Sequence, residues 1–340
     1  MSYKVGIYGG SGYTGAELLR LCAQHPDLDV AFATADSQAG TWAADLYPSL
    51  AAAYPDLVFA DNDPALADEH GIDLAFLALP HGASQHLVPD LRKRVAKIVD
   101  LAADFRLRDA ALYPTWYGEE HHQPALLDEF AFGIPELYRD QLRNADLVAA
   151  AGCYVTTAAL ALAPLIKHNV IEPTQVIVDA ASGVSGAGRK LAHGTHFGTV
   201  NEDFTAYGLL NHRHTPEIEQ ATGAVNLLFT PHLAPMTRGI LATCYARPAT
   251  ATPDPLAILK EAYADEPFVV VTENPPSTKA TLGSNCAHIT ARYDERTDTV
   301  VVLSALDNLV KGASGQAVQC ANLALGLPET AGLPIVAVYP

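Results

Sequence analysis

The feature that most restricts the fold of this chain is a glycine loop close to its amino end. Residues 4–8 form a short apolar run typical of a buried parallel strand, and residues 16–21 form a helical pattern. Gly9, Gly12 and Gly15 lie between these two runs. Glycines in such a loop permit a tight turn and let the backbone approach a pyrophosphate, which the amino end of the helix attracts. The loop therefore predicts a dinucleotide site on a parallel sheet.

The rest of the first half continues the alternation of strands and helices. Apolar runs that indicate further strands lie at residues 30–34, 74–79, 98–101 and 147–150. Helical patterns and polar turns separate them, so we expect an α/β Rossmann-type doubly wound parallel sheet.

The pattern changes after residue 151. Strand-like runs are then farther apart, at residues 176–180, 227–230, 240–245, 268–271 and 300–303. This spacing favours an α+β second domain with a mainly antiparallel sheet. We expect a cofactor-binding domain at residues 1–151 and a catalytic and oligomerisation domain at 152–311. The C-terminal segment 312–340, helical to about residue 325, is expected to pack back on the first domain.

The composition limits the partners and the location of the protein. Asp and Glu number 38 against 21 Lys and Arg, a formal net charge of −17, which disfavours nucleic acid or an anionic membrane as a partner. Five cysteines make a disulfide framework improbable and indicate a reducing compartment. We see no signal peptide and no apolar run long enough to span a bilayer. A cytoplasmic protein is therefore expected.

One cysteine stands where a nucleophile is expected. Cys153 follows an apolar run and Gly152, and it precedes the helix-forming run 158–163. A thiol in the first turn of a helix meets partial positive charge, which favours the nucleophilic thiolate. Beside a nicotinamide, such a sulfur suggests reduction of an acyl group through a thioester. The remaining cysteines are interpreted as small apolar core residues.

The choice between NAD and NADP is left open by the residues themselves. Asp36 and Ser37 follow the second predicted strand. An acidic residue there usually binds a ribose 2′-hydroxyl and favours NAD, whereas a serine and free backbone N–H groups are able to hold a 2′-phosphate.

Four more segments carry groups suited to a cleft. Residues 79–84 and 100–106 follow parallel strands, at the sheet edge where ligands bind. Residues 182–190 combine glycines, hydroxyls, Arg and Lys, which favours an anion-binding nest. In the proline-bounded loop 230–239, Arg238 is suited to bind a phosphate or a carboxylate.

Two histidines flank an arginine at the start of a predicted helix. His212 and His214 are therefore candidates for acid–base catalysis and carboxylate binding. A zinc site is disfavoured, because no cysteine or acidic cluster accompanies the pair.

Taken together, these segments resemble the N-acetyl-γ-glutamyl-phosphate reductase family of the aspartate-semialdehyde dehydrogenase-like superfamily. The resemblance spans almost the whole chain, and the ordered combination of motifs is specific. The matching segments are residues 9–15, 79–82, 103–106, 152–154, 182–189, 212–218, 235–240, 283–285 and 307–317.

The resemblance implies a reaction and its cofactor. It implies NADPH-dependent reduction of N-acetyl-L-glutamyl 5-phosphate to N-acetyl-L-glutamate 5-semialdehyde, with release of phosphate, in arginine biosynthesis. Cys153 is implied as the nucleophile that forms a thioester, and His212 and His214 are implied in catalysis and substrate binding. We favour His214 as the group that protonates the developing oxyanion. A homo-oligomer, dimer or tetramer, is also implied.

Further site residues are expected on the same basis. Contacts to NADP(H) are expected from Gly9, Ser11, Gly12, Tyr13, Thr14, Gly15, Ser37, Pro80, His81, Ser182, Gly183, Ser185, Gly186 and Asn308. Contacts to the substrate and its phosphate are expected from Arg106, Ser185, Arg189, His212 and Arg238. No metal is expected.

The sequence departs from the family pattern in places. Ala151 and Val155 stand where proline is frequent, Ala102 where serine is usual, and Ala181 and Thr41 where lysine is common. The change at Thr41 weakens the expected grip on the cofactor's 2′-phosphate.

Three alternatives remain beside this interpretation. A carrier-linked aminoadipyl-phosphate reductase of lysine biosynthesis is disfavoured, because an acidic carrier would be repelled by a net charge of −17. An aspartate-semialdehyde dehydrogenase fits poorly with the segments 212–218 and 235–240. A non-catalytic dinucleotide sensor is disfavoured by the combination of Cys153 with two nearby histidines.

Overall fold

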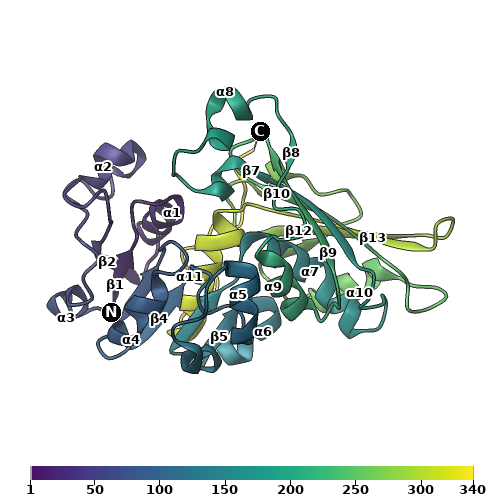
Figure 1. Ribbon diagram of the computed structural model, residues 1–340, viewed down its shortest axis with the longest axis horizontal. Coiled ribbons are helices and arrows are strands. Elements are labelled where there is room, and N and C mark those ends of the chain that lie inside the picture. Colours follow the sequence, from purple (N-terminus) through teal and green to yellow (C-terminus); the bar gives the residue numbers. More distant parts are fainter. Residues whose placement is uncertain (1, 340) are drawn as a thin grey trace. The chain divides into compact units, whose positions relative to one another are not determined.

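A six-stranded parallel sheet forms the first of two units in the computed structural model, which describes residues 2–339 (Figure 1). Its strand order is β2-β1-β3-β4-β6-β5, and every neighbouring pair is parallel. The strands are β1 (Tyr3–Tyr8), β2 (Leu28–Ala33), β3 (Leu74–Leu77), β4 (Lys97–Asp100), β5 (Phe130–Gly133) and β6 (Leu147–Ala150). The predicted doubly wound parallel sheet is confirmed, although β5 was not among the strands that the sequence indicated.

The strands of this sheet are apolar because helices and loops cover both of its faces. Ile7, Phe76 and Val99 are completely buried, as expected for parallel strands inside an α/β unit. The helices of the unit are α1 (Tyr13–Cys22), α2 (Ala43–Leu46), α3 (Leu66–His70), α4 (Ser84–Leu91), α6 (Pro135–Leu142) and α11 (Gly315–Ala324).

The last helix of the chain belongs to this first unit. A π-helical turn, Val310–Ser314, precedes α11, so the regular helix starts three residues later than the sequence pattern indicated. α11 packs against α6 and β4. The Nε2 atom of His25 lies 3.0 Å from Oδ1 of Asn322 on α11.

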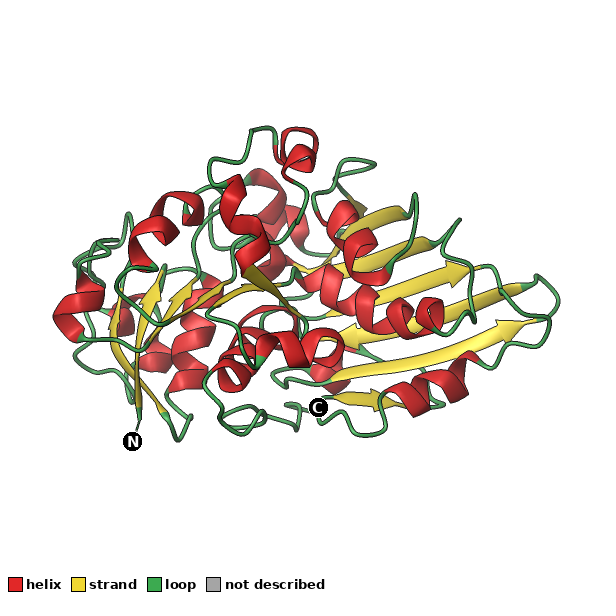
Figure 2. Cartoon of the chain, turned by 90° about the horizontal axis from the view of Figure 1, so that it is seen from below, coloured by secondary structure: helices red, strands yellow, loops and turns green. Residues whose placement is uncertain are grey.

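The second unit is built on a seven-stranded mixed sheet, whose long strands run side by side in Figure 2. Its order is β11-β12-β13-β10-β7-β9-β8, with two parallel pairs, β11/β12 and β7/β9. The other four pairs are antiparallel, which confirms the predicted mainly antiparallel sheet. The strands are β7 (Ile177–Gly183), β8 (Thr205–Ala206), β9 (Leu228–Ala234), β10 (Ile240–Ala246), β11 (Val269–Val271), β12 (Ala287–Asp294) and β13 (Thr299–Leu306).

Helices cover one face of this sheet. α7 (Cys153–Lys167) packs on β10 and β13, and α10 (Pro255–Ala262) packs on β12. α9 (His214–Thr222) packs on α7. Along the middle strands buried and more exposed residues alternate, and Ile177, Leu228 and Tyr245 are exposed apolar residues at paired positions of three adjacent strands. This unit therefore has apolar side chains on an open part of its sheet.

Each unit is made of three segments of the chain. The first unit contains the residues up to Pro114, Gly118–Ala151 and Ala313–Leu333. The second contains Thr115–Tyr117, Gly152–Gly312 and the residues from Pro334 on. Thr115–Tyr117 are the last three residues of the short helix α5 (Tyr113–Tyr117). Residues 334–339, which were expected in the first domain, thus group with the second unit. The cause is local pairing, since the N–H of Asn285 donates to Pro334 and that of Val338 to Leu282.

Within residues 2–339, no helix has the length and apolar character needed to cross a membrane.

Candidate active site

Cys153 is the first residue of α7, a helix of 15 residues. Gly152 before it is extended, with φ −66° and ψ 152°, and turns the chain into the helix. The Cys153 side chain is half-buried, whereas the other four cysteines are buried. The first-turn N–H groups of α7 and their partial positive charge thus surround the one accessible thiol among the described residues.

A pocket of about 500 Å³ opens beside this cysteine. All of its lining residues belong to the second unit. Cys153, Tyr154, Tyr207, His212 and His214 are among them. The structure therefore brings the thiol and both candidate histidines to one cavity, although they lie about sixty residues apart in the sequence.

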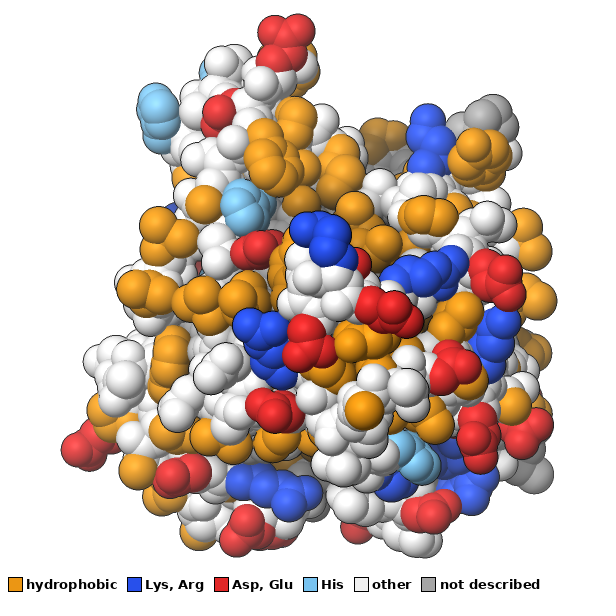
Figure 3. Space-filling model, turned by 90° about the vertical axis from the view of Figure 1, so that its right-hand side faces the viewer, with side chains coloured by type: hydrophobic (Ala, Val, Ile, Leu, Met, Phe, Trp, Pro, Cys, Tyr) orange, Lys and Arg blue, Asp and Glu red, His pale blue; other side chains and the backbone are white. Residues whose placement is uncertain are grey.

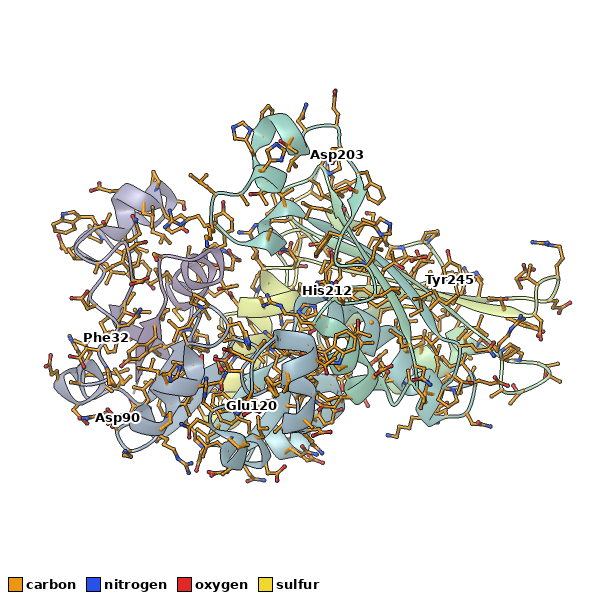
Figure 4. All side chains as sticks on the ribbon, in the orientation of Figure 1. Phe32, Asp90, Glu120, Asp203, His212 and Tyr245 are labelled. Carbon is orange, nitrogen blue, oxygen red and sulfur yellow. The ribbon has the colours of Figure 1, made fainter. Side chains whose placement is uncertain are left out.

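His212, labelled in Figure 4, is held as a neutral imidazole with a defined tautomer. Its Nδ1 accepts the backbone N–H of His214 at 3.1 Å, so the ring proton is on Nε2. Tyr154, Tyr207 and Phe229 surround the ring at centroid distances of 5.3 to 5.7 Å. Burial, and secondarily the charge of Arg213, lower the pKa of His212 to about 4. His212 is therefore a hydrogen-bond donor to the pocket at neutral pH.

This neutral histidine has a consequence for stability. Between its ordinary pKa of about 6.5 and about 4, the unfolded chain binds a proton at His212 that the folded chain does not. The contribution of His212 is present above pH 6.5, and about 3 kcal/mol is lost as the pH falls toward 4. We expect urea unfolding at pH 7 and pH 4.5 to show a smaller pH-dependent loss for His212→Gln than for the wild type.

The exposed His168 supplies the matched control, because His168→Gln removes a histidine that is not buried. A His212→Gln variant with the same pH dependence as the wild type would contradict the assignment of a buried neutral ring.

His214 and Glu217 lie on one face of α9. His214 is the first residue of this helix and is buried, and its ring lies 4.8 Å from that of His212. Glu217, three residues on, is completely buried and accepts the N–H of Gly152 at 2.8 Å. This contact fixes the turn that presents Cys153. Glu217 lies within the motif at residues 212–218 but was not a predicted site residue. The signal in the sequence was a carboxylate three residues after His214.

Two tyrosines complete the wall of the pocket. The Tyr207 hydroxyl donates to the Tyr154 hydroxyl at 3.1 Å, and Tyr154 donates to the backbone oxygen of His232. Burial raises the pKa of Tyr207 to about 12 and also raises that of Tyr154. Both remain neutral hydroxyls near the thiol. Neither was a predicted site residue.

Gly312 leaves room for the nucleophile. A Cβ at this position would lie 2.8 Å from Cβ of Cys153 and 3.2 Å from the buried Leu306 side chain. Gly312→Ala is expected to displace Cys153 and to lower the free energy of unfolding by about 1–3 kcal/mol. The measurements are urea unfolding and the rate at which iodoacetamide labels Cys153.

Gly198→Ala is the matched control for Gly312→Ala, because a Cβ there makes only ordinary contacts, at 3.6 Å and beyond. Unchanged labelling and stability in Gly312→Ala would show that the helix start tolerates a side chain against the thiol.

Only part of the predicted anion-binding segment, residues 182–190, lines the pocket. Ser182 and Gly186 line the pocket. Asn308 connects the segment to the next loop, because its Nδ2 donates to Ser185 Oγ at 2.9 Å and its Oδ1 accepts the N–H of Gly239. A Cβ on Gly183 would meet Thr237 backbone atoms at 2.7 Å. Residues 183–185 are thus packed closely against the loop at residues 237–239.

Two arginines of this unit were predicted to bind the substrate or its phosphate. Arg189 and Arg238 are not among the lining residues that the structure describes. Arg238 lies 3.6 Å from Asp307, a completely buried carboxylate.

In the first unit, the glycine loop has the close packing that a dinucleotide cradle needs. Gly9 has a φ of +90°, and a Cβ on Gly15 would lie 2.3 Å from the Gly9 oxygen. Ser11 and Thr14 are fixed through their backbone oxygens, which accept hydrogen bonds from Tyr47 Oη and Ser314 Oγ, both at 2.8 Å. Gly12 precedes α1, which begins at Tyr13 with no side-chain cap. The amino end of α1 therefore presents its N–H groups.

A second loop of this unit is ordered by a buried aspartate. Asp104 accepts the N–H of Gly82 at 2.7 Å, and its Oδ1 lies 2.6 Å from Nδ1 of His81. Burial opposes ionisation of Asp104, but the hydrogen bond from His81 and those from backbone N–H groups lower its pKa overall. Pro80 and Ser37 are exposed, and Arg106 is buried with Nη2 donating to Leu101 O at 2.6 Å. Arg106 belongs to the first unit, whereas the pocket belongs to the second.

Among the described residues, no group of three or more His, Cys, Asp or Glu is arranged to hold a metal ion.

Two family models match the two halves of the chain. Residues 4–145 match the NAD binding domain of semialdehyde dehydrogenases, and residues 153–308 match the semialdehyde dehydrogenase dimerisation domain.

Curated relatives are similar over nearly their whole length. An N-acetyl-gamma-glutamyl-phosphate reductase of Symbiobacterium thermophilum is 48% identical over 344 residues, covering 98% of each chain. One from Cellvibrio japonicus is 45% identical over 349 residues, covering 99% of each.

Solved structures of aspartate semialdehyde dehydrogenases share the fold. That of enzyme II from Vibrio cholerae, complexed with ASA, has a TM-score of 0.71 at 14% identity and covers 95% of this chain and 98% of its own. That of the Candida albicans enzyme with NADP has a TM-score of 0.69 at 13% identity, covering 94% and 98%.

Proposed function

The chain belongs to the semialdehyde dehydrogenase family and, within it, to the N-acetyl-γ-glutamyl-phosphate reductases, and on that premise we propose its reaction. It reduces N-acetyl-L-glutamyl 5-phosphate to N-acetyl-L-glutamate 5-semialdehyde and releases phosphate, as a step of arginine biosynthesis. The observation that carries the proposal is Cys153 at the start of α7, sharing a pocket with His212 and His214.

The alternatives fit the chain less well. Aspartate semialdehyde dehydrogenases are similar at 13% and 14% identity in the structures compared, against 45% and 48% for the reductases. A sensor without catalysis has no use for an accessible thiol beside two histidines.

The chemistry begins at the thiol. Sγ of Cys153 attacks the acyl carbon, the carbon–oxygen bond to phosphate breaks, and a thioester forms with release of phosphate. Backbone N–H groups at the start of α7 stabilise the oxyanion during this step. Ser182, Ser185, Arg189, Arg238 and Arg106 are proposed to bind substrate or departing phosphate.

The two histidines are proposed to have different roles in the reduction of the thioester. His214 gives a proton to the carbonyl oxygen as the thioester is reduced and takes it back when the aldehyde leaves. His212 donates through Nε2–H and orients the substrate, because its Nδ1 is already engaged. Glu217 holds the Gly152 turn and is a positioning residue.

NADP(H), when bound, supplies the hydride. The close packing at Gly9 and Gly15 fits a dinucleotide, and the proposed contacts in this unit are Ser11, Gly12, Tyr13, Thr14, Ser37, Pro80 and His81. In the second unit they are Ser182, Gly183, Ser185, Gly186 and Asn308. The first unit is thus the proposed cofactor-binding domain and the second the proposed catalytic domain.

The chain is proposed to act in the cytoplasm as a homo-oligomer, a dimer or tetramer. Exposed apolar residues on the seven-stranded sheet, such as Ile177, Leu228 and Tyr245, support this. Figure 3 also shows hydrophobic side chains exposed between charged ones on one side of the molecule.

The reverse reaction tests the function directly. With the semialdehyde, NADP and phosphate, absorbance at the nicotinamide band should rise only when phosphate is present. A rise with a different semialdehyde, and none with N-acetyl-L-glutamate 5-semialdehyde, would overturn the proposed substrate. No rise with any semialdehyde would overturn the proposal that the chain is a reductase.

A further inference from the structure

The end of β2 lacks the charge that a 2′-phosphate needs. In a doubly wound sheet the adenosine ribose is bound beside the carboxyl end of this strand, where an acid selects the 2′-hydroxyl and an arginine selects the 2′-phosphate. Here Thr34 and Ala35 are buried, and the chain then presents Asp36 and Ser37, both exposed.

No basic side chain from this part of the sequence compensates Asp36. Residues 21–91 contain neither Lys nor Arg. Of the two before them within the unit, Arg20 pairs with Glu17 at 2.6 Å in the last turn of α1, and Lys4 donates to the backbone oxygen of His70. Both lie toward the end of the sheet at which the parallel strands begin, because α1 runs back from the glycine loop and Lys4 is near the start of β1. They are therefore at the opposite end from Asp36.

The remaining basic residues of the unit begin at Arg92, after α4. Three of them lie in the turn between α4 and β4, at residues 92–94, and the others follow from β4 onward. In the sheet, β1 and β3 separate β4 from β2. Arg92 and Arg94 are paired with Glu129 and Asp68.

We infer that this chain discriminates weakly between NADPH and NADH, with Asp36 binding the ribose 2′-hydroxyl of NADH and opposing the 2′-phosphate of NADPH. The inference rests on the proposed function for the choice of a nicotinamide dinucleotide as the ligand. It departs from the preference for NADP over NAD that the family resemblance implied. Ser37 and backbone N–H groups are the partners left for a 2′-phosphate.

Direct binding tests the inference without substrate or turnover. The enzyme is titrated with NADPH and with NADH, and each dissociation constant is read from the change in nicotinamide fluorescence. One charge-assisted hydrogen bond to the 2′-phosphate would favour NADPH by about ten- to a hundredfold. Because no cation in the described part of this unit is placed to make that bond, the two dissociation constants should lie within about tenfold of each other. NADPH binding more than about a hundredfold tighter, or binding of neither nucleotide, would overturn the inference.

Salt gives a second, signed readout. Raising the ionic strength screens the repulsion between Asp36 and a 2′-phosphate. The ratio of the two constants should therefore shift toward NADPH. A shift toward NADH would show that a cation holds the phosphate.

Substitutions at the strand end complete the test. Asp36→Ser should weaken NADH and shift the ratio toward NADPH by about tenfold or more, and Ser37→Arg should shift it in the same direction by adding a phosphate partner. Asp29→Ser is the matched control, because Asp29 is an exposed aspartate at the other end of the same strand. An unchanged ratio in Asp36→Ser would overturn the role of Asp36. Tight nucleotide binding without reductase turnover would instead contradict the proposed function and leave this inference standing.

Discussion

Replacing Cys153 by Ser is expected to lower kcat for acyl-phosphate reduction by about 10⁴-fold or more, because the hydroxyl cannot take the place of the thiolate nucleophile. Cys153 occupies the first position of α7, where helix N–H groups surround Sγ. Serine is close to cysteine in size, so the pocket and the Gly152–Glu217 hydrogen bond should persist. Nucleotide affinity should be that of the wild type. The experiment compares steady-state turnover with nicotinamide fluorescence titration.

Cys286→Ser is the matched control for this prediction. Cys286 lies in the same unit, and its thiol donates to the Ile335 oxygen at 3.4 Å, a contact that a hydroxyl can make. It should keep the wild-type rate. Appreciable turnover by Cys153→Ser, beyond what contamination explains, would eliminate the covalent mechanism.

His214→Gln is expected to reduce kcat by about 10²- to 10⁴-fold, the usual effect of losing a general acid–base group. The buried ring of His214 lines the Cys153 pocket and stands at the start of α9. Glutamine keeps a polar group there but cannot exchange a proton near neutral pH. The pH profile of kcat should therefore lose the limb that reports this histidine, and KM for NADPH should not change.

Added imidazole separates a proton-transfer role from a structural one. Partial recovery of kcat by imidazole in His214→Gln is the expected result, and His168→Gln, on an exposed position, should behave as the wild type. If His214→Gln kept the wild-type pH profile, proton transfer would have to be assigned to another group.

Local signals predicted much of the fold and part of the site. The glycine loop and the turn at Gly152 are set by neighbours in the sequence, so the strand–loop–helix units around them followed from the pattern of apolar residues and glycines. β12 was missed because His288 and Arg292 interrupt its apolar pattern, and its partner β13 stabilises it across the sheet.

Contacts made across the second unit were not predictable from single-sequence patterns. Glu217 and Gly152 are 65 residues apart, and Tyr207 and Tyr154 are 53 apart. Only the packing of α9 on α7 and the pairing of β8 with β9 bring these groups together. The position of Arg238 beside Asp307 is of the same kind, because a buried carboxylate from the end of β13 decides where the guanidinium lies.

The tight space at Gly312 also bears on how sequences of related chains are compared. Cβ of Cys153 and the oxygen of Asp307 fill the volume that any side chain would need. A chain of this fold that carries alanine or a larger residue there must either hold its cysteine in a different position or have given up the cysteine's chemistry. A larger residue at this one place thus marks aligned sequences in which the helix start holds the cysteine differently, even where the cysteine itself is retained.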